Sequence, residues 1–305
     1  MKQFYMVGTF QTEQEIKDYV RYWDGDLETR MENTARMISK IPNLRFLGLT
    51  GPTCSGKTTA ARKLTDYLEK HGRRVHVISL DDFYFDKAYL KMRADNDPSI
   101  EIDYDSEETI DMDLFSQKIE SLMKNELTEM PRFDFPSGLR VKGDVIDPDP
   151  ADVFLIEGIQ VLYPKVNAIL RRATYQNIYI FPESAIEIGG EIFVPNEIRL
   201  MRRLVRDFHF RASSPEFTFF LWQSVRANEE KSIFPYEKSC DYFIDSTMPY
   251  EIGMLKPYLE NILSKMPRDD EFYNDAESIL KKISDIQSIK SDYITENSLY
   301  KEFIS

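Results

Sequence analysis

The stretch LRFLGLTGPTCSGKTTAARKLTDYLEK, residues 44–70, decides the fold. Its apolar run at 44–49 is typical of a buried strand, and the pattern at 57–70 is that of a helix. Gly72 follows the helix, where glycine is favoured because it tolerates positive φ. A second apolar run follows at 75–80, so the segment predicts a βαβ unit whose parallel strands are neighbours.

Residues 51–58, GPTCSGKT, match the phosphate-binding pattern G-x-x-x-x-G-K-[ST] between the expected strand and the expected helix. Glycines let the backbone curl so that several N–H groups and the helix N-terminus face one point and hold nucleotide phosphates. Lys57 adds a positive charge, and Thr58 offers a hydroxyl ligand for Mg²⁺. The residues expected to bind ATP here are Gly51, Thr53, Cys54, Ser55, Gly56, Lys57, Thr58 and Thr59.

The composition narrows the function classes. The chain has 305 residues, 42% hydrophobic and 30% charged, which is typical of one large globular domain or two of ordinary size. Its net charge of −13 disfavours partners such as nucleic acid or an anionic membrane surface. Two cysteines and three histidines are too few for a disulfide framework or a structural metal site. The first residues lack the order of a secretory signal, and no apolar run could cross a bilayer, so we expect a cytoplasmic protein.

Alternating strands and helices predict an α/β fold with a parallel sheet. Further elements are expected as strands at 153–156, 178–181 and 242–244, a helix around 114–122, a loop at 84–106 and a β-hairpin at about 131–147. We expect a core at 44–265 between helical extensions at 1–43 and 266–305. The first extension should hold two helices separated by a turn at 24–26. The second has an apolar stripe that either docks on the core or forms a dimer interface: Ile279, Leu280, Ile283, Ile286 and Ile289.

Carboxylates follow two of the expected strands. Glu157 ends one, and Asp81 and Asp82 end another. Ligands of open parallel sheets lie beyond the carboxyl ends of the strands, so we expect these groups to face Lys57. Thr58, Glu157 and Asp81 would then form the Mg²⁺ site, and Asp81 or Asp82 could deprotonate an acceptor hydroxyl. The base-reading N-K-x-D motif of GTPases is absent from the sequence, which favours phosphate transfer to a small molecule.

A cationic stripe lies within residues 197–215. Its members, spaced i, i+3, i+4 and i+7 on one helix face, are Arg199, Arg202, Arg203 and Arg206. Apolar residues occupy the opposite face, and Arg211 follows as a further ATP contact. A solvated basic face is the usual explanation of such a stripe. In an acidic chain with a phosphate-binding loop, we expect instead a lid helix whose guanidinium groups face phosphates.

These segments, in this order, resemble the uridine kinase and phosphoribulokinase family of P-loop kinases over about residues 44–262. Besides the phosphate-binding loop, the resemblance rests on LDDFY at 80–84, YD at 104–105, PRFDF at 131–135 leading to Arg140, FLIEG at 154–158, RLMRRLVRD at 199–207 and IFP at 233–235. It implies a five-stranded parallel sheet flanked by helices, a hairpin over the acceptor, an Arg-rich lid, and ATP with Mg²⁺ as cofactors.

The resemblance also implies roles for single residues. Asp81 would be the general base, and Asp105 would accept hydrogen bonds from ribose hydroxyls. Arg203 and Arg206 would clamp phosphates, completing with Lys57 and Asp81 the set expected to be catalytic. The remaining positions expected to bind the substrate, several of them rings that could stack on a base, are Tyr84, Tyr104, Phe133, Phe135 and Arg140.

Some positions depart from the family's pattern. Uridine–cytidine kinases have a tyrosine where this chain has Phe133 and a histidine where it has Gly138, both close to the pyrimidine base. The family's R-G-R lid sequence is reduced here to Arg211-Ala212-Ser213. Segments between 217 and 235, in contrast, resemble a bacterial subgroup of nucleoside or uridine kinases.

Three functions remain open on this basis. The first is a kinase that phosphorylates the 5′-hydroxyl of a ribonucleoside such as uridine or cytidine. The second uses the same chemistry on a phosphorylated sugar or another hydroxylated metabolite. The third is an ATP-binding regulatory protein that acts through its terminal helices. The expected partner in the first two is a small-molecule acceptor, and self-association is an open alternative.

Overall fold

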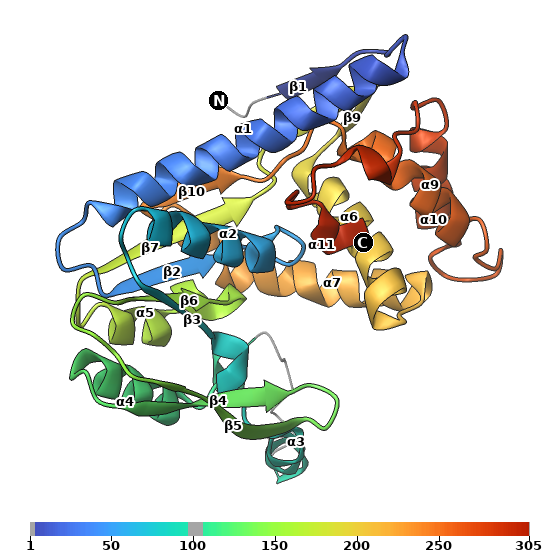
Figure 1. Ribbon diagram of the computed structural model, residues 1–305. Coiled ribbons are helices and arrows are strands. Elements are labelled where there is room, and N and C mark those ends of the chain that lie inside the picture. Colours follow the sequence, from blue (N-terminus) through green and yellow to red (C-terminus); the bar gives the residue numbers. More distant parts are fainter. Residues whose placement is uncertain (1–3, 97–105, 305) are drawn as a thin grey trace.

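The computed structural model describes residues 4–96 and 106–304. At its centre lies an all-parallel sheet with the strand order β10–β7–β2–β6–β3 (Figure 1). These five strands are β2 (Phe46–Thr50), β3 (Val75–Ser79), β6 (Val153–Glu157), β7 (Tyr175–Phe181) and β10 (Tyr242–Asp245). The predicted α/β fold with five parallel strands is therefore confirmed.

Helices cover both faces of the sheet, because successive side chains of each strand point to opposite sides. Leu47 and Leu49 of β2 join one buried cluster with α1 (Glu13–Ser39) and α2 (Lys57–Lys70). Phe46 faces the other side, in a second cluster with α4 (Met112–Met123) and α5 (Pro164–Leu170). The remaining helices are α3 (Lys87–Asn96), α6 (Pro195–Arg211), α7 (Pro215–Ser232), α8 (Phe234–Glu237), α9 (Glu251–Leu263), α10 (Tyr273–Ile283), α11 (Lys301–Ile304), and the short η1 (Leu80–Phe83), η2 (Glu107–Thr109), η3 (Ile159–Leu162) and η4 (Ser291–Tyr293).

The expectation that the first two strands of the core are neighbours is wrong. β6 lies between β2 and β3 and pairs with both. The physical reason is burial: the four apolar residues of β6 before Glu157 are all buried, as in a strand with a partner on each side. β3, in contrast, leaves Val77 48% exposed, which suits the edge of the sheet.

The expected turn at 24–26 is also absent, because α1 is one continuous helix. Tertiary contacts outweigh the Asp-Gly-Asp signal here. Asp24 is buried, and its carboxylate accepts hydrogen bonds from the hydroxyls of Tyr250 and Ser298 at 2.5 and 2.8 Å. These bonds fix the helix at the point where the local sequence favours a break.

The stretch 84–106, expected as a loop, contains α3 before residues 97–105, which lie outside the described part of the chain. This helix has little apolar periodicity and buries only Leu90, so no helical pattern was recognisable in this stretch. Its start is held by the predicted hairpin, since the Lys87 amide donates to the carbonyl of Gly138 at 2.9 Å. That hairpin consists of β4 (Thr128–Asp134) and β5 (Leu139–Ile146).

The two ends of the chain differ in detail from expectation. β1 (Phe4–Val7), β8 (Ala185–Ile188) and β9 (Glu191–Phe193) form a second sheet that sequence analysis missed. The apolar stripe of the C-terminal part docks on the core, as the first of its two interpretations expected. The helix ends at Ile283, however, so Ile286 and Ile289 dock from irregular chain. No helix in the described ranges is long and apolar enough to span a membrane.

Candidate active site

The candidate site lies at the carboxyl ends of β2, β6 and β3. The phosphate-binding loop, residues 51–58, connects β2 to α2 and depends on two glycines. A Cβ at Gly51 would lie 2.0 Å from the carbonyl oxygen of Ile180, so only glycine fits against β7. Gly56 has a φ of +93°, in the left-handed region that favours glycine, and it caps α2.

Lys57 and Ser55 are the polar side chains at the centre of this loop. The Lys57 ammonium donates to the carbonyl oxygens of Gly51 and Pro52 at 2.8 and 2.9 Å. Burial lowers the pKa of Lys57, an effect that the charge of Glu157 opposes. The Ser55 hydroxyl is buried and has no hydrogen-bond partner among the described residues. The loop therefore offers a cation and an unpaired hydroxyl to one small volume.

Two carboxylates approach the loop from the neighbouring strands. Glu157 ends β6 and accepts a hydrogen bond from the Ser79 hydroxyl at 2.7 Å. Asp81 follows β3 in η1. Burial raises the pKa of both carboxyls above the usual range, and the positive charge of Lys57 acts in the opposite direction. These groups are poised to bind a cation or to accept a proton.

The four arginines of the predicted stripe on α6 divide into two pairs. Arg203 and Arg206 line the same cavity as the loop, and Asp207 accepts hydrogen bonds from their Nε atoms at 3.1 and 2.9 Å. Arg211, at the end of α6, lines the cavity as well. Three arginines thus line the same cavity as Lys57, as expected for phosphate contacts.

The other two arginines of the predicted stripe lie elsewhere. Arg199 and Arg202 are fully buried and donate to the carbonyl oxygens of Thr53 and Cys54 at 2.9 and 3.2 Å. Arg199 forms an ion pair with Glu229 of α7. Arg202 forms one with Glu251 of α9 at 2.6 Å. These side chains hold the loop from behind, so the helix has no simple cationic face.

One cavity of about 270 Å³ collects most of the predicted site residues. Those brought together are Thr53, Cys54, Ser55, Lys57, Thr58, Asp81, Tyr84, Glu157, Arg203, Arg206 and Arg211. Gly51 and Gly56 of the loop, and Thr59 directly after it, do not line the cavity. Sequence analysis missed two acidic members, Glu229 and Glu302. Glu229 stands three residues after Arg226, a helical pairing signal, whereas nothing in the local sequence marks Glu302.

The hairpin side of the site is joined to η1. The Asp82 carboxylate accepts a hydrogen bond from the Phe133 amide at 2.9 Å, and the Phe133 ring meets Tyr84 edge to face at 5.7 Å. Asp82 therefore seats the hairpin next to the cavity. Of the other predicted substrate residues, Phe135 is 54% exposed and Arg140 forms an ion pair with Asp111 at 2.9 Å.

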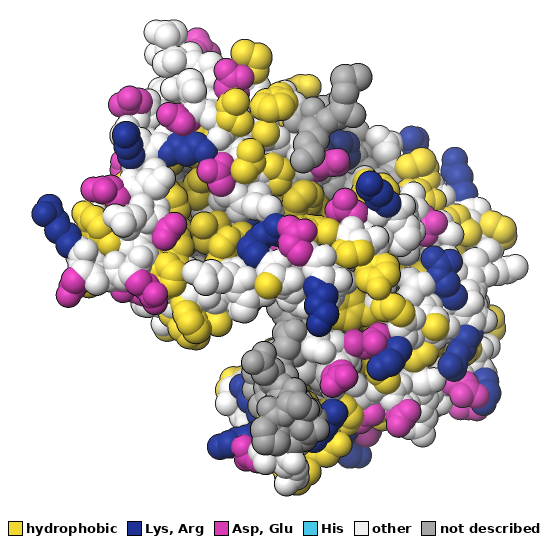
Figure 2. All heavy atoms as spheres, turned by 180° about the vertical axis from the view of Figure 1, so that it is seen from behind, with side chains coloured by type: hydrophobic (Ala, Val, Ile, Leu, Met, Phe, Trp, Pro, Cys, Tyr) yellow, Lys and Arg dark blue, Asp and Glu magenta, His cyan; other side chains and the backbone are white. Residues whose placement is uncertain are grey.

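Tyr104 and Asp105 lie outside the described residues, so their predicted contacts are not placed. Seen from behind, the surface has a deep notch above the lower lobe, which contains α3 and the hairpin (Figure 2). Oppositely charged side chains are interspersed around it.

The residues present fit a nucleoside triphosphate with Mg²⁺. The unpaired Ser55 hydroxyl and the cations of the cavity suit phosphate oxygens. Thr58, Glu157 and Asp81 offer oxygen ligands. Within the described ranges no three His, Cys, Asp or Glu residues could hold a metal by themselves. This agrees with the usual mode of Mg²⁺, which is bound by one or two carboxylates together with substrate phosphates and water.

Residues 46–252 match the model of the Phosphoribulokinase / Uridine kinase family. The chain belongs to this family. Similar proteins include the uridine kinase of Lactobacillus helveticus, which is 28% identical over 232 residues, or 75% of this chain and 100% of the relative. The uridine kinase of Staphylococcus aureus strain JH9 is 28% identical over 224 residues, 72% and 97% of the two chains. The structure of a possible uridine kinase from Bacillus stearothermophilus is 19% identical, with a TM-score of 0.47 and coverage of 72% and 100%.

Membership confirms the family that the sequence motifs indicated. The protein is a phosphotransferase that acts on a hydroxyl acceptor, as kinases of the uridine kinase family do. The family also implies a small-molecule acceptor and ATP as the phosphate donor. The match leaves out residues 1–45 and 253–305, where α1 and the C-terminal helices α10 and α11 lie.

Proposed function

We propose that the protein transfers the γ-phosphate of ATP to the 5′-hydroxyl of a ribonucleoside. One observation carries the proposal: a single cavity collects Lys57, Asp81 and Arg203 around the phosphate-binding loop. Phosphoryl transfer needs little more from a protein than positioned cations, a metal site and a group that orients the acceptor hydroxyl. The uridine kinases among the relatives favour a nucleoside as the acceptor.

The chain's residues would divide the work as follows. The loop amides, Lys57 and the Ser55 hydroxyl would hold the phosphates of the donor. Thr58 and Glu157 would hold Mg²⁺. Bound MgATP supplies the transferable phosphoryl group and the cation that offsets part of its charge. Arg203 and Arg206, steadied by Asp207, would offset the charge that develops during transfer.

Asp81 would accept the proton of the attacking hydroxyl. It lies at the carboxyl end of β3 and lines the cavity with Lys57 and Tyr84. Burial raises its pKa toward the range in which a carboxylate is a better proton acceptor. Asp82, one residue later, bonds the hairpin instead, which favours Asp81 as the base.

The acceptor would lie beside Tyr84, on the side of the cavity where the hairpin packs. Asp82 is the positioning residue on this side, because it fixes Phe133 against Tyr84. Aromatic rings accept many bases, and this surface leaves the choice of base open. A phosphorylated sugar is the second candidate acceptor, favoured by the three arginines that share the cavity.

The proposal is tested by ADP release from MgATP in the presence of single ribonucleosides, deoxynucleosides and phosphorylated sugars. A ribonucleoside is expected to stimulate release in a saturable manner. Stimulation by a phosphorylated sugar alone would replace the nucleoside with the second acceptor. ATP consumption that no acceptor alters would contradict both and favour the regulatory alternative.

The activity is expected to fall on the acid side at a pH above the ordinary aspartate range of about 4. The reason is that burial raises the pKa of Asp81 and of Glu157, and a protonated carboxyl neither accepts a proton nor binds Mg²⁺. The two carboxyls lie in one cavity, so the loss of activity at acid pH reflects the titration of both together and not of either one alone. A profile of kcat/KM against pH measures it, since this ratio reports the free enzyme. A limb at the ordinary aspartate pKa would contradict the prediction.

A further inference from the structure

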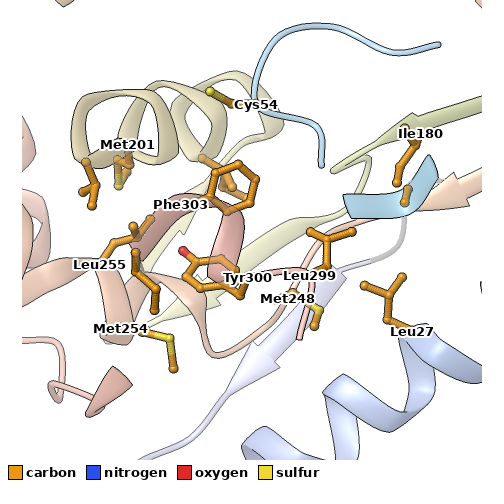
Figure 3. Close-up of a cluster of buried hydrophobic side chains, with 14 of the residues drawn as sticks. Leu27, Cys54, Ile180, Met201, Met248, Met254, Leu255, Leu299, Tyr300 and Phe303 are labelled. Atoms are coloured by element: carbon orange, nitrogen blue, oxygen red, sulfur yellow. The ribbon is translucent and has the colours of Figure 1, made fainter. Parts of the chain in front are cut away.

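The C-terminal residues 295–304, called the tail below, close over the phosphate-binding loop. Leu299 covers Gly56 so tightly that a Cβ there would lie 2.7 Å from Leu299 Cδ2. Figure 3 shows Leu299, Tyr300 and Phe303 of the tail in one buried cluster with Cys54 of the loop. The tail lies outside the residues that match the family model, which end at 252.

Glu302 of the tail reaches the phosphate-binding groups themselves. Its Oε2 accepts a hydrogen bond from the Thr59 amide at 3.1 Å, and its side chain lines the cavity. Thr59 is the third residue of α2, so its N–H has no acceptor within the helix. Such amides, at the positive end of the helix, are the donors that phosphates use.

The tail is tethered, which brings this carboxylate close. Asp24 of α1 accepts hydrogen bonds from the Ser298 hydroxyl and the Thr295 amide, both at 2.8 Å. At the far end, the Phe303 ring lies 4.9 Å from the Arg202 guanidinium. Glu302 lies between these two attachments and lines the same cavity as Lys57. Its negative charge acts to raise the pKa of Lys57, against the larger effect of burial.

A carboxylate and a phosphate cannot both use this position. The Thr59 N–H has one hydrogen to donate, and two anions held at one helix N-terminus repel each other. Glu302 supplies at this position what a phosphate oxygen would supply, namely a negative charge and a hydrogen-bond acceptor beside the loop. Leu299 meanwhile lies over Gly56, where the backbone of the loop curls.

We infer that Glu302 occupies the position of a nucleotide phosphate, so that the tail closes the site and ATP must displace it. The inference rests on the proposed ATP site. It makes residues 299–304 an internal competitor whose local concentration is set by the tether at Asp24. The tail competes with the phosphate part of the nucleotide and not with its nucleoside part.

Three single variants of the full chain separate this mechanism from a general effect of charge. Glu302→Gln removes the competing charge, and Leu299→Ala loosens the tail without changing any charge. Glu296→Gln is the matched control, because Glu296 is an exposed tail residue outside the cavity. Thermal unfolding followed by circular dichroism verifies that each variant is folded.

The probes are ATP, inorganic tripolyphosphate and adenosine, titrated by calorimetry. Glu302→Gln is expected to bind ATP and tripolyphosphate about tenfold more tightly than the original chain, because a charge-assisted hydrogen bond to the Thr59 amide is replaced by a weaker neutral one. Leu299→Ala should shift both affinities in the same direction. Adenosine affinity and the Glu296→Gln control should be unchanged. Equal tripolyphosphate affinities in all four proteins would overturn the inference.

Hydrogen exchange of the original chain gives a readout without any variant. Saturating tripolyphosphate should speed exchange at the tail amides 299–304, whereas slower exchange there would show that the tail closes over phosphate and would also overturn the inference. A failure of the proposed function would look different. If the variants bind tripolyphosphate more tightly but no protein binds ATP, the tail mechanism stands and ATP is not the donor. If neither probe binds any protein, both fall.

Discussion

Asp81→Asn is expected to lower kcat by about 10²- to 10⁴-fold, the range that general acid–base catalysis contributes. Asparagine matches the shape of aspartate but cannot accept the proton of the attacking hydroxyl. The loop residues that would bind ATP are unaltered, so the affinity for ATP should stay within a few-fold of the original. Single-turnover ADP formation and a separate ATP titration measure the two quantities.

Asp82→Asn is the comparison that makes this result specific. Its amide oxygen can still accept the hydrogen bond of the Phe133 amide, so the hairpin should keep its seat on η1. We expect kcat to stay within a few-fold of the original for Asp82→Asn. Ordinary turnover in Asp81→Asn, or a loss confined to Asp82→Asn, would show that Asp81 is not the base.

Glu251→Leu is expected to lower the free energy of unfolding by about 3–5 kcal/mol, the cost of leaving one partner of a buried ion pair uncompensated. Glu251 and Arg202 are both fully buried. The carboxylate accepts from Arg202 Nε at 2.6 Å and from the Met248 amide at 2.9 Å. Its removal leaves the guanidinium charge inside the core. Chemical denaturation followed by tryptophan fluorescence measures the change.

The double variant Arg202→Met with Glu251→Leu is the control. It removes both charges, so it should recover a large part of the lost stability. Recovery should be incomplete, because Arg202 also donates to the carbonyl oxygens of Cys54 and Ser246, which would lose their donor. A double variant less stable than Glu251→Leu alone would contradict this account of the pair.

The parts of the site that a short sequence determines were predictable. The phosphate-binding loop is a local pattern between a strand and a helix, and the motif predicted the helix at Lys57–Lys70 with both ends correct. Asp81 and Glu157 follow apolar strands, and parallel strands end at one edge of the sheet. Their position near Lys57 follows from the parallel topology alone. The position of β6 between β2 and β3, in contrast, was not predicted.

The parts that depend on distant residues were not predictable. Helical spacing places Arg199 and Arg202 on one face with Arg203. The first two, however, pair with carboxylates 30 and 49 residues further along the chain, whereas Arg203 pairs with Asp207 of its own helix. The tail contact of Glu302 with Thr59 spans 243 residues. The assigned roles of the site residues and the boundaries of the core at 44 and 265 stay predictions.

The hydrogen bonds of Asp24 make α1 and the tail depend on each other across the sequence. Thr295, which donates to this carboxylate through its amide, lies 271 residues away. A chain that lost α1 would leave buried donors of the tail and of Tyr250 without their acceptor, a cost for each such group. Natural selection would therefore act on the two segments as one heritable unit. Among relatives, we expect both to be present or both to be missing, and substitutions at position 24 to be accompanied by changes at 295 and 298.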